Sequence, residues 1–196
     1  MSLLKLNKNI SGISSENFAK EFCKHPLVQS FVKEFEKNHN KIIRFLPFDS
    51  ERDFKNIHLL YPAWNARELA INKNINSQLS RLWVYGKYPK NFVTCLIDGE
   101  VCFILGFANV ENRHAIELSL LSGKSLKKSW SHKFAEIFSI YMSLLIKTYP
   151  KDFVLASCDK EFSVYAKFVE HFGFVFWEEY SGYGREYSLY IFKTVL

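Results

Sequence analysis

The chain has 196 residues, of which 48% are hydrophobic and 23% charged, and this composition excludes an intrinsically disordered protein. The formal net charge of +6 favours an anionic partner, which could be nucleic acid, a phosphorylated cofactor or a membrane surface. No run of the sequence reaches the roughly 18 apolar residues of a membrane span, and the start lacks the apolar segment of a signal peptide. We therefore expect no membrane partner.

The cysteines indicate neither a metal centre nor a secreted protein. Cys23, Cys95, Cys102 and Cys158 form no CxxC motif, and no histidine cluster lies near them, so no metal is expected. Free thiols in a chain of this size are typical of a reducing compartment. We therefore expect a cytoplasmic protein.

Two helices are predicted in the first forty residues. Apolar and charged residues recur at helical spacing over 15–39, and Pro26 divides this stretch. Large apolar side chains of these helices would be exposed if the helices stood alone. We expect the helices to pack on the rest of the chain through these residues: Phe18, Phe22, Leu27, Phe31 and Phe35.

A strand and two helices are predicted next. The stretch "KIIRFLPF", which starts at Lys41, has the composition of a strand. The following "DSERDFKNIHLL" begins with an Asp/Ser cap and continues as a helix. Another helix is expected around 65–82, before a loop that ends at Pro89.

The clearest local signal is a hairpin at Asp98-Gly99. Two β-rich runs flank this dipeptide, which is the preferred sequence of a type I′ turn. A two-residue loop would place Cys95 directly opposite Cys102, a distance that does not forbid a disulfide. Either a disulfide or two reduced neighbours fits the sequence, and a cytoplasmic location favours the reduced pair.

The C-terminal half alternates strands and helices. "HAIELSLL" predicts a strand, and an amphipathic helix follows over 130–149, ending before Pro150. "DFVLASC" is a predicted strand, "KEFSVYAKFVEHF" a helix, and "FVFWEEY" and "YSLYIFKTVL" are two final strands. This order of elements predicts a mixed α/β fold with neighbouring antiparallel strands.

One short stretch, "AKFVEHFGFVFWEEY", joins a helix to a strand through Gly173. Glycine caps a helix in the left-handed conformation without steric cost, so the strand can start at once. Together with the Asp98-Gly99 hairpin, the long helix and the final hairpin, this junction resembles the fold of the GNAT superfamily, whose C-terminal part has such a helix-to-strand junction. The members of this superfamily are acyl-CoA-dependent N-acyltransferases. The resemblance extends from Lys41 to Leu196.

The resemblance implies a mixed α+β fold in which helices flank a central, mostly antiparallel sheet, with an extra helical segment at the N-terminus. It divides the chain into an N-terminal helical extension, 1–40, and a GNAT-like acyltransferase domain, 41–196. It implies acetyl-CoA or another acyl-CoA as co-substrate, an amine acceptor and no metal. The acceptor could be a small molecule or a protein.

In this superfamily a glycine-rich loop that opens the long helix binds the pyrophosphate of coenzyme A, helped by the helix dipole. The corresponding stretch here is "LSGKSLKKSWSHKF", in which Lys127, Ser129 and Ser131 fall on the small-residue positions and Leu126 on the Arg/Gln position. Lysine side chains, including Lys133, supply positive charge. The resemblance implies these cofactor-binding residues: Leu121, Ser122, Gly123, Lys124, Lys127, Lys128 and Ser129.

This sequence departs from the catalytic pattern of the superfamily, both at the usual tyrosine and at a loop asparagine whose position falls near Phe162. Many members place a tyrosine four residues before the glycine of the Gly-Phe pair, where it protonates the leaving thiolate. That position is Val169 here, and Tyr165, one turn earlier, is the candidate replacement. A core aromatic is the alternative reading of Tyr165.

Glu117 is the best candidate for a catalytic base. Alternation along "AIELSLL" puts Ile116, Leu118 and Leu120 on one face and Glu117 on the other. A central strand covered on both sides should be apolar on both faces. A glutamate on one face therefore indicates that this face borders a solvent-filled cleft. The superfamily often supplies here a carboxylate that removes a proton from the amine. A structural carboxylate is the alternative, and His114 is a weaker candidate.

Three functional hypotheses follow. The first is an acyl-CoA-dependent N-acyltransferase. The second is a catalytically inactive GNAT-like protein with an interaction or assembly role, favoured by the departures at Lys127 and Val169. The third, nucleic-acid binding, is unsupported by any recognised motif. The aromatic last strand, "YSLYIFK", could pair across a homodimer.

Overall fold

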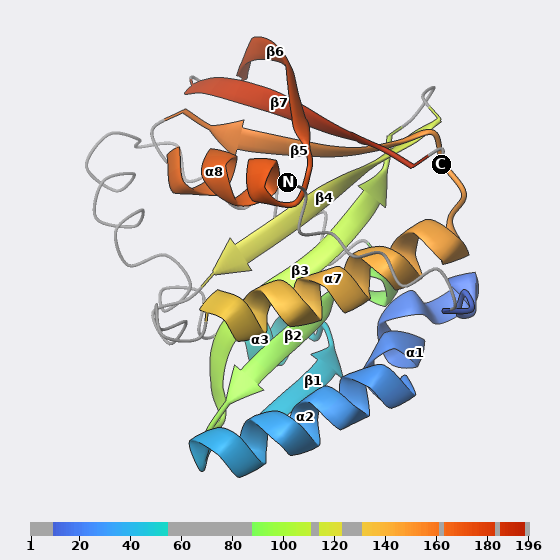
Figure 1. Cartoon of the computed structure of the whole chain (residues 1–196), viewed down its shortest axis with the longest axis vertical. Coiled ribbons are helices and arrows are strands. Elements are labelled where there is room, and N and C mark those ends of the chain that lie inside the picture. The colour runs from blue at the N-terminus through green and yellow to red at the C-terminus, as the bar shows by residue number, and fades with distance from the viewer. Residues whose placement is uncertain are drawn as a thin grey trace.

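A single sheet of seven strands organises the part of the chain that the structure describes (Figure 1). The structure is a computed structural model, and it describes residues 10–54, 88–110, 114–122, 131–160, 163–182 and 185–194. The strands are β1 Ile43–Pro47, β2 Val93–Ile97, β3 Glu100–Asn109, β4 Ala115–Ser122, β5 Phe153–Asp159, β6 Val175–Gly182 and β7 Arg185–Lys193. The α-helices are α1 Phe18–Lys24, α2 Pro26–His39, α3 Ser50–Phe54, α7 Ser131–Thr148 and α8 Ser163–His171, with 3-10 turns at Ser15–Asn17 and Pro89–Asn91.

The sheet is mixed but mostly antiparallel, as the sequence predicted. Its strand order is β1-β2-β3-β4-β5-β7-β6. Among the described strands, only β4 and β5 pair in parallel, and every other neighbouring pair is antiparallel. The chain needs α7 to cross between these two parallel strands, which is the usual requirement for a parallel pair.

The two faces of the sheet differ in what covers them. Side chains such as Ile116 and Val154 join the main hydrophobic core with α1, α2, α7 and α8, so we call their side the helix face. In Figure 1 this face is turned toward the viewer, and α7 crosses in front of β3. The opposite side carries Glu117 and Leu155, because side chains alternate along a strand, and we call it the Glu117 face.

The N-terminal helices are part of the main core. Pro26 starts α2, and the side chain of His25 caps it by accepting a hydrogen bond from the backbone N–H of Leu27. The Phe18 ring is fully buried and meets the ring of Tyr141 on α7 edge-on, with 5.3 Å between centroids. Phe22, Phe31 and Phe35 are also buried. The expected packing of these helices is therefore confirmed.

The hairpin turn is as predicted, but the register beyond it is not. Asp98 and Gly99 both have positive φ angles, 51° and 85°, as a type I′ turn requires. A β-bulge shifts the register between Cys95 and Leu96, so that Leu96 pairs with Val101 but Cys95 pairs with Phe103. The expectation that Cys95 faces Cys102 was therefore wrong. The bulge inserts one extra residue into β3, and Cys95 and Cys102 are both buried free thiols.

The helix-to-strand junction at Gly173 has the expected geometry. Gly173 has a φ of 87°, which only glycine adopts without strain. Its N–H donates to the carbonyl of Glu170, and the N–H of Phe174 donates to the carbonyl of Val169, which is the Schellman pattern. Val169 and Phe174 are both buried, so an apolar contact accompanies the cap. Strand β6 follows directly.

The amphipathic pattern predicted the long helix α7, and the structure contains it. Phe134, Ile137 and Phe138 are buried, as the amphipathic pattern of α7 predicted. The helix expected around 65–82 lies outside the described residues. Among the helices that the structure describes, none is long and apolar enough to cross a membrane.

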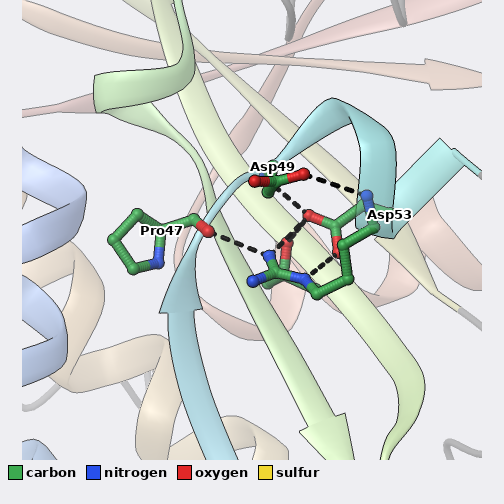
Figure 2. Close-up of polar contacts among 5 residues, drawn as sticks. Pro47, Asp49 and Asp53 are labelled. Carbon is green, nitrogen blue, oxygen red and sulfur yellow. Dashed lines mark hydrogen bonds and ion pairs between the residues drawn. The ribbon is translucent and has the colours of Figure 1, made fainter.

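A buried carboxylate fixes the short helix α3 against β2. Asp53 is fully buried and accepts two hydrogen bonds from Arg52, through Nε at 2.6 Å and Nη2 at 2.8 Å. The hydroxyl of Thr94 donates to the same carboxylate at 2.7 Å, and the backbone N–H of Asp49 does so at 2.9 Å. Figure 2 shows Asp53 beside Pro47, whose carbonyl also accepts from Arg52. Hydrogen bonding to Asp53 raises the pKa of Arg52.

We expect the substitution Asp53→Ala to lower the free energy of unfolding by about 3 kcal/mol, because it removes the buried carboxylate that pairs with the partly exposed Arg52 and leaves the buried hydroxyl of Thr94 without this acceptor. Urea denaturation measures this change. Glu179→Ala is the matched control, since it also removes a carboxylate from an ion pair, with Lys160 at 2.5 Å, but on the surface. The control should lose at most about 1 kcal/mol. Equal losses in the two variants would show that the Asp53 network contributes nothing special to stability.

Candidate active site

Strands β4 and β5 separate in the middle of the sheet. They pair from Ala115 opposite Phe153 to Leu118 opposite Ala156, over four positions. Beyond these, residues 119–122 of β4 pair with β3, and residues 157–159 of β5 pair with β7. Figure 1 shows the two strands fanning apart toward their carboxyl ends. A wedge between two strand edges therefore opens at this point.

Glu117 and Ser157 meet at the base of this wedge. Glu117 lies opposite Leu155, and Ser157 is two residues further along β5, so both side chains are on the Glu117 face. The hydroxyl of Ser157 donates a hydrogen bond to Oε1 of Glu117 at 2.6 Å. Both residues are half-buried, which leaves access to the carboxylate. The polar position that the strand pattern predicted is thus close to the wedge.

Near Glu117, a glycine of β3 packs directly against an aromatic ring. Gly106 of β3 pairs with Ser119 of β4 on the Glu117 face. A Cβ atom at Gly106 would lie 2.0 Å from the ring of Phe92, so no other residue fits under that ring. Phe92 is buried and packs edge-on against Phe48. This part of the site is therefore a close-packed apolar wall beside a row of polar side chains.

The second catalytic candidate lies on the other face. Tyr165 is in the first turn of α8 and packs, half-buried, against the main hydrophobic core. Val169, at the position where the superfamily often has its tyrosine, is buried. Cys158 is also buried on this face, and burial raises the pKa of its thiol to about 12. The Cys158 thiol therefore stays protonated at neutral pH and is no nucleophile.

The expected cofactor loop falls mostly outside the described residues. Leu121 and Ser122 are the last two residues of β4, paired with Ile104 and Phe103. The remaining expected residues, Gly123, Lys124, Lys127, Lys128 and Ser129, lie outside the described ranges. Strand β4 ends and α7 begins on either side of them, at Ser122 and Ser131.

One lysine that was expected to supply charge to the loop is engaged elsewhere. Lys133 Nζ contacts Glu34 of α2 at 2.5 Å and Glu136 at 3.0 Å, and its side chain is only 13% exposed. Hydrogen bonding to Glu34 raises its pKa. Two carboxylates neutralise this ammonium group, so Lys133 joins α2 to α7 and does not point a free charge at a phosphate.

His114 lies at the far end of the paired region. It precedes β4, is exposed, and its Nδ1 lies 3.2 Å from Oδ2 of Asp152. Because the wedge opens at the other end of the β4–β5 pairing, His114 is not beside it. His114 is therefore not one of the residues at the wedge.

Two polar side chains were missed by reading the sequence. Ser157 stands on the same face as Leu155 and Phe153, and a polar residue in that alternating row was a usable signal. Asp53 gave no such signal, because an acidic residue near a helix start is usually exposed. In the described part of the chain, no group of three or more His, Cys, Asp or Glu side chains is placed to hold a metal ion.

Known proteins resemble this chain in their fold but not detectably in their sequence. No protein-family model matches the sequence. No curated protein sequence matches it either. Solved structures, by contrast, are similar over most of the chain.

Three of these structures illustrate the likeness. An acetyltransferase from Streptococcus agalactiae superimposes with a TM-score of 0.58 at 11% identity, over 79% of this chain and 99% of that one. Ard1 from Thermoplasma volcanium gives a TM-score of 0.56 at 12% identity, over 80% and 99%. A GCN5-related N-acetyltransferase from Brucella melitensis gives 0.55 at 14% identity, over 78% and 76%.

At these identities the likeness concerns the fold. Among the described strands of this sheet, β4 and β5 are the only parallel pair, and they open into a wedge. The chain therefore has the GNAT fold, as a divergent member of that structural class.

Proposed function

We propose that this protein is an acyl-CoA-dependent N-acyltransferase that transfers an acetyl group from acetyl-CoA to an amine. One observation carries the proposal: an accessible carboxylate, Glu117, lies at the base of the wedge between β4 and β5 in a GNAT fold. The acetyl group is proposed because the similar structures are acetyltransferases.

The wedge suits the shape and chemistry of coenzyme A. Its facing edges are residues 119–122 and 157–159, which pair with other strands on their far sides. An extended chain that carries amide groups can lie along such a strand edge through backbone hydrogen bonds. Coenzyme A has an arm of this kind between its thiol and its phosphates, so the described strand edges fit it.

In the proposed reaction the amine nitrogen attacks the thioester carbonyl carbon, the new C–N bond forms and the C–S bond breaks. Glu117 accepts the proton that the amine loses, directly or through a water molecule. Tyr165 is the proposed proton donor to the departing thiolate. No metal is needed, since the thioester is already an activated acyl group.

The phosphates of coenzyme A are proposed to bind at residues 121–129, where β4 leads into the start of α7. A helix N-terminus favours negative charge, and its free N–H groups can bind phosphate oxygens. The proposed residues are Leu121, Ser122, Gly123, Lys124, Lys127, Lys128 and Ser129. Lysine side chains would add positive charge there.

We expect the triple variant Lys124→Ala/Lys127→Ala/Lys128→Ala to bind acetyl-CoA about tenfold more weakly at low salt, with a smaller loss at high salt because salt screens exposed charges. Isothermal titration calorimetry measures both. The matched control replaces the exposed lysines Lys20, Lys24 and Lys33 by alanine, which removes the same net charge. An equal loss in the control, or unchanged affinity in the triple variant, would place the phosphates elsewhere.

The proposed function itself is tested in two steps. Acetyl-CoA at about 100 times its dissociation constant should add about 2.7 kcal/mol to the stability of the folded protein, which a thermal shift detects. Acetyl transfer to a panel of small amines and amine-bearing peptides, followed by mass spectrometry, then tests catalysis. Binding without transfer across the panel would exclude the proposed activity on these acceptors.

A second candidate function is a catalytically inactive GNAT-fold protein with an interaction or assembly role. The buried Val169 favours it, because no hydroxyl is present where many members have their tyrosine. Absence of both the thermal shift and transfer would support this alternative. The parent protein under the first hypothesis gives both signals, so the two steps separate the candidates.

Two further features are proposed with the enzyme. We propose a cytoplasmic location, consistent with the free thiols of Cys23, Cys95, Cys102 and Cys158. The last strand, β7, pairs with β5 on one side and β6 on the other, so the expectation that it pairs across a homodimer was wrong. We propose instead that a homodimer forms through β6, which lies at the edge of the described sheet and exposes Phe176 and Trp177. Light scattering of the purified protein tests the second point.

A further inference from the structure

We propose that Ser157 is a positioning residue that holds the carboxylate of Glu117 in its working orientation. This inference rests on the proposed function, because it assigns Ser157 a role through the proposed base. Its observation is separate: the Ser157 hydroxyl donates to Oε1 of Glu117 at 2.6 Å across two strands that no longer pair at that point.

The backbone of β5 holds Ser157 in a fixed position, from which it can orient the long side chain of Glu117. Glu117 has three rotatable side-chain bonds, and a half-buried carboxylate without a partner would sample several rotamers. Ser157 has one such bond, and its backbone is held in the sheet opposite Leu189 of β7, which is buried. The hydroxyl therefore has few positions, and the strong hydrogen bond to a charged acceptor transfers that order to Glu117.

The hydrogen bond also distinguishes the two oxygens of the carboxylate. The hydroxyl proton of Ser157 occupies one lone pair of Oε1, so Oε2 is favoured as the oxygen that receives the proton of the amine or of an intervening water. The donor on β5 thus biases which oxygen of the proposed base on β4 takes the proton. Serine in this role donates a hydrogen bond and forms no covalent bond with the acyl group.

Kinetics provides the first test. We expect Ser157→Ala to lower kcat for amine acetylation about tenfold, while KM for acetyl-CoA stays unchanged. Ser157→Thr, which keeps the hydroxyl and suits a strand, should restore kcat to within about threefold of the parent. Ser139→Ala is the matched control, since that half-buried serine donates only to the carbonyl of Ala135 within α7. The control should keep the parental kcat.

A double variant separates positioning from an independent role. In a Glu117→Gln background, Ser157→Ala should cause little further loss, because the group that it orients is gone. A full additional tenfold loss would show that Ser157 acts on the substrate itself. An acetyl group found on Ser157 by intact-mass analysis after incubation with acetyl-CoA would also overturn the positioning role.

A crystallographic comparison tests the inference even without turnover. High-resolution crystal structures of the parent and of Ser157→Ala should show one Glu117 rotamer in the parent and several in the variant. An unchanged single rotamer in Ser157→Ala would refute positioning and leave the proposed function intact. Failure of the parent to acetylate any amine would refute the proposed function, and the rotamer comparison would still decide the role of Ser157.

Discussion

Glu117→Gln is expected to lower the turnover number about 100-fold while the fold and the affinity for acetyl-CoA stay unchanged. Glutamine keeps the size of the side chain and can still accept the hydrogen bond that Ser157 donates to Oε1. It has no basicity, so the amine must lose its proton to bulk water. The remaining rate should rise at high pH, where more of the amine is already deprotonated.

Three measurements check this expectation together. Steady-state rates with a responsive amine give turnover, calorimetry gives acetyl-CoA affinity, and a melting curve reports on the fold. Glu100→Gln, at an exposed position beside the hairpin turn, is the matched control and should retain parental activity. If Glu117→Gln transfers acetyl groups as fast as the parent at neutral pH, Glu117 is a structural carboxylate.

Acyl-CoA hydrolysis is not a substitute for this assay. Water is already neutral, whereas a protonated amine must first lose a proton to free the lone pair that attacks, so hydrolysis does not depend on a base in the same way as amine acetylation. A variant could therefore keep slow hydrolysis and lose acetyl transfer. The rate of amide formation is the quantity that reports on Glu117.

Local rules predicted those parts of the fold that depend on a few neighbouring residues. The Asp98-Gly99 turn and the cap at Gly173 each need a positive φ, and glycine supplies it where the sequence has it. The alternation along β4 put Ile116 in the core and Glu117 on the opposite face, because a strand has a period of two residues. These signals are contained within short stretches.

Features that depend on two strands at once were not predictable in the same way. The bulge between Cys95 and Leu96 changes the pairing partner of Cys95 from Cys102 to Phe103. Nothing in either strand alone specifies the extra residue in β3. The separation of β4 and β5 results from their different outer partners, β3 and β7. The hydrogen bond between Glu117 and Ser157 exists only because these distant segments meet, so the sequence indicated the candidate base Glu117 and not the serine that donates to it.

Electrostatic pairing across elements explains the remaining error. Lys133 was expected to serve the cofactor loop because it lies near Lys124 and Lys127 in the sequence. In the fold its ammonium group contacts Glu34, which comes from a helix almost one hundred residues earlier. A buried or half-buried ammonium group is most stable beside carboxylates, so the fold decides its partner.

Deletion of residues 1–38 is expected to abolish the stable monomer. The deleted segment contains Phe18, Phe22, Phe31 and Phe35, each at most 4% exposed. Loss of one buried phenylalanine costs about 3–5 kcal/mol, and a whole domain has only about 5–15 kcal/mol of stability. The truncated chain should therefore aggregate or unfold, which size-exclusion chromatography and circular dichroism detect.

Two single substitutions show whether the loss comes from the core or from the length of the chain. Phe18→Ala should lower the free energy of unfolding by about 3–5 kcal/mol, because the ring packs against both Phe107 and Tyr141. Lys20→Ala, an exposed position on the same helix, should change it by no more than about 0.5 kcal/mol. A truncated protein that remains monomeric with an unchanged melting temperature would establish 1–40 as a dispensable extension. If the truncated chain does not fold, the helices of that extension are part of the hydrophobic core on which the sheet and its wedge depend.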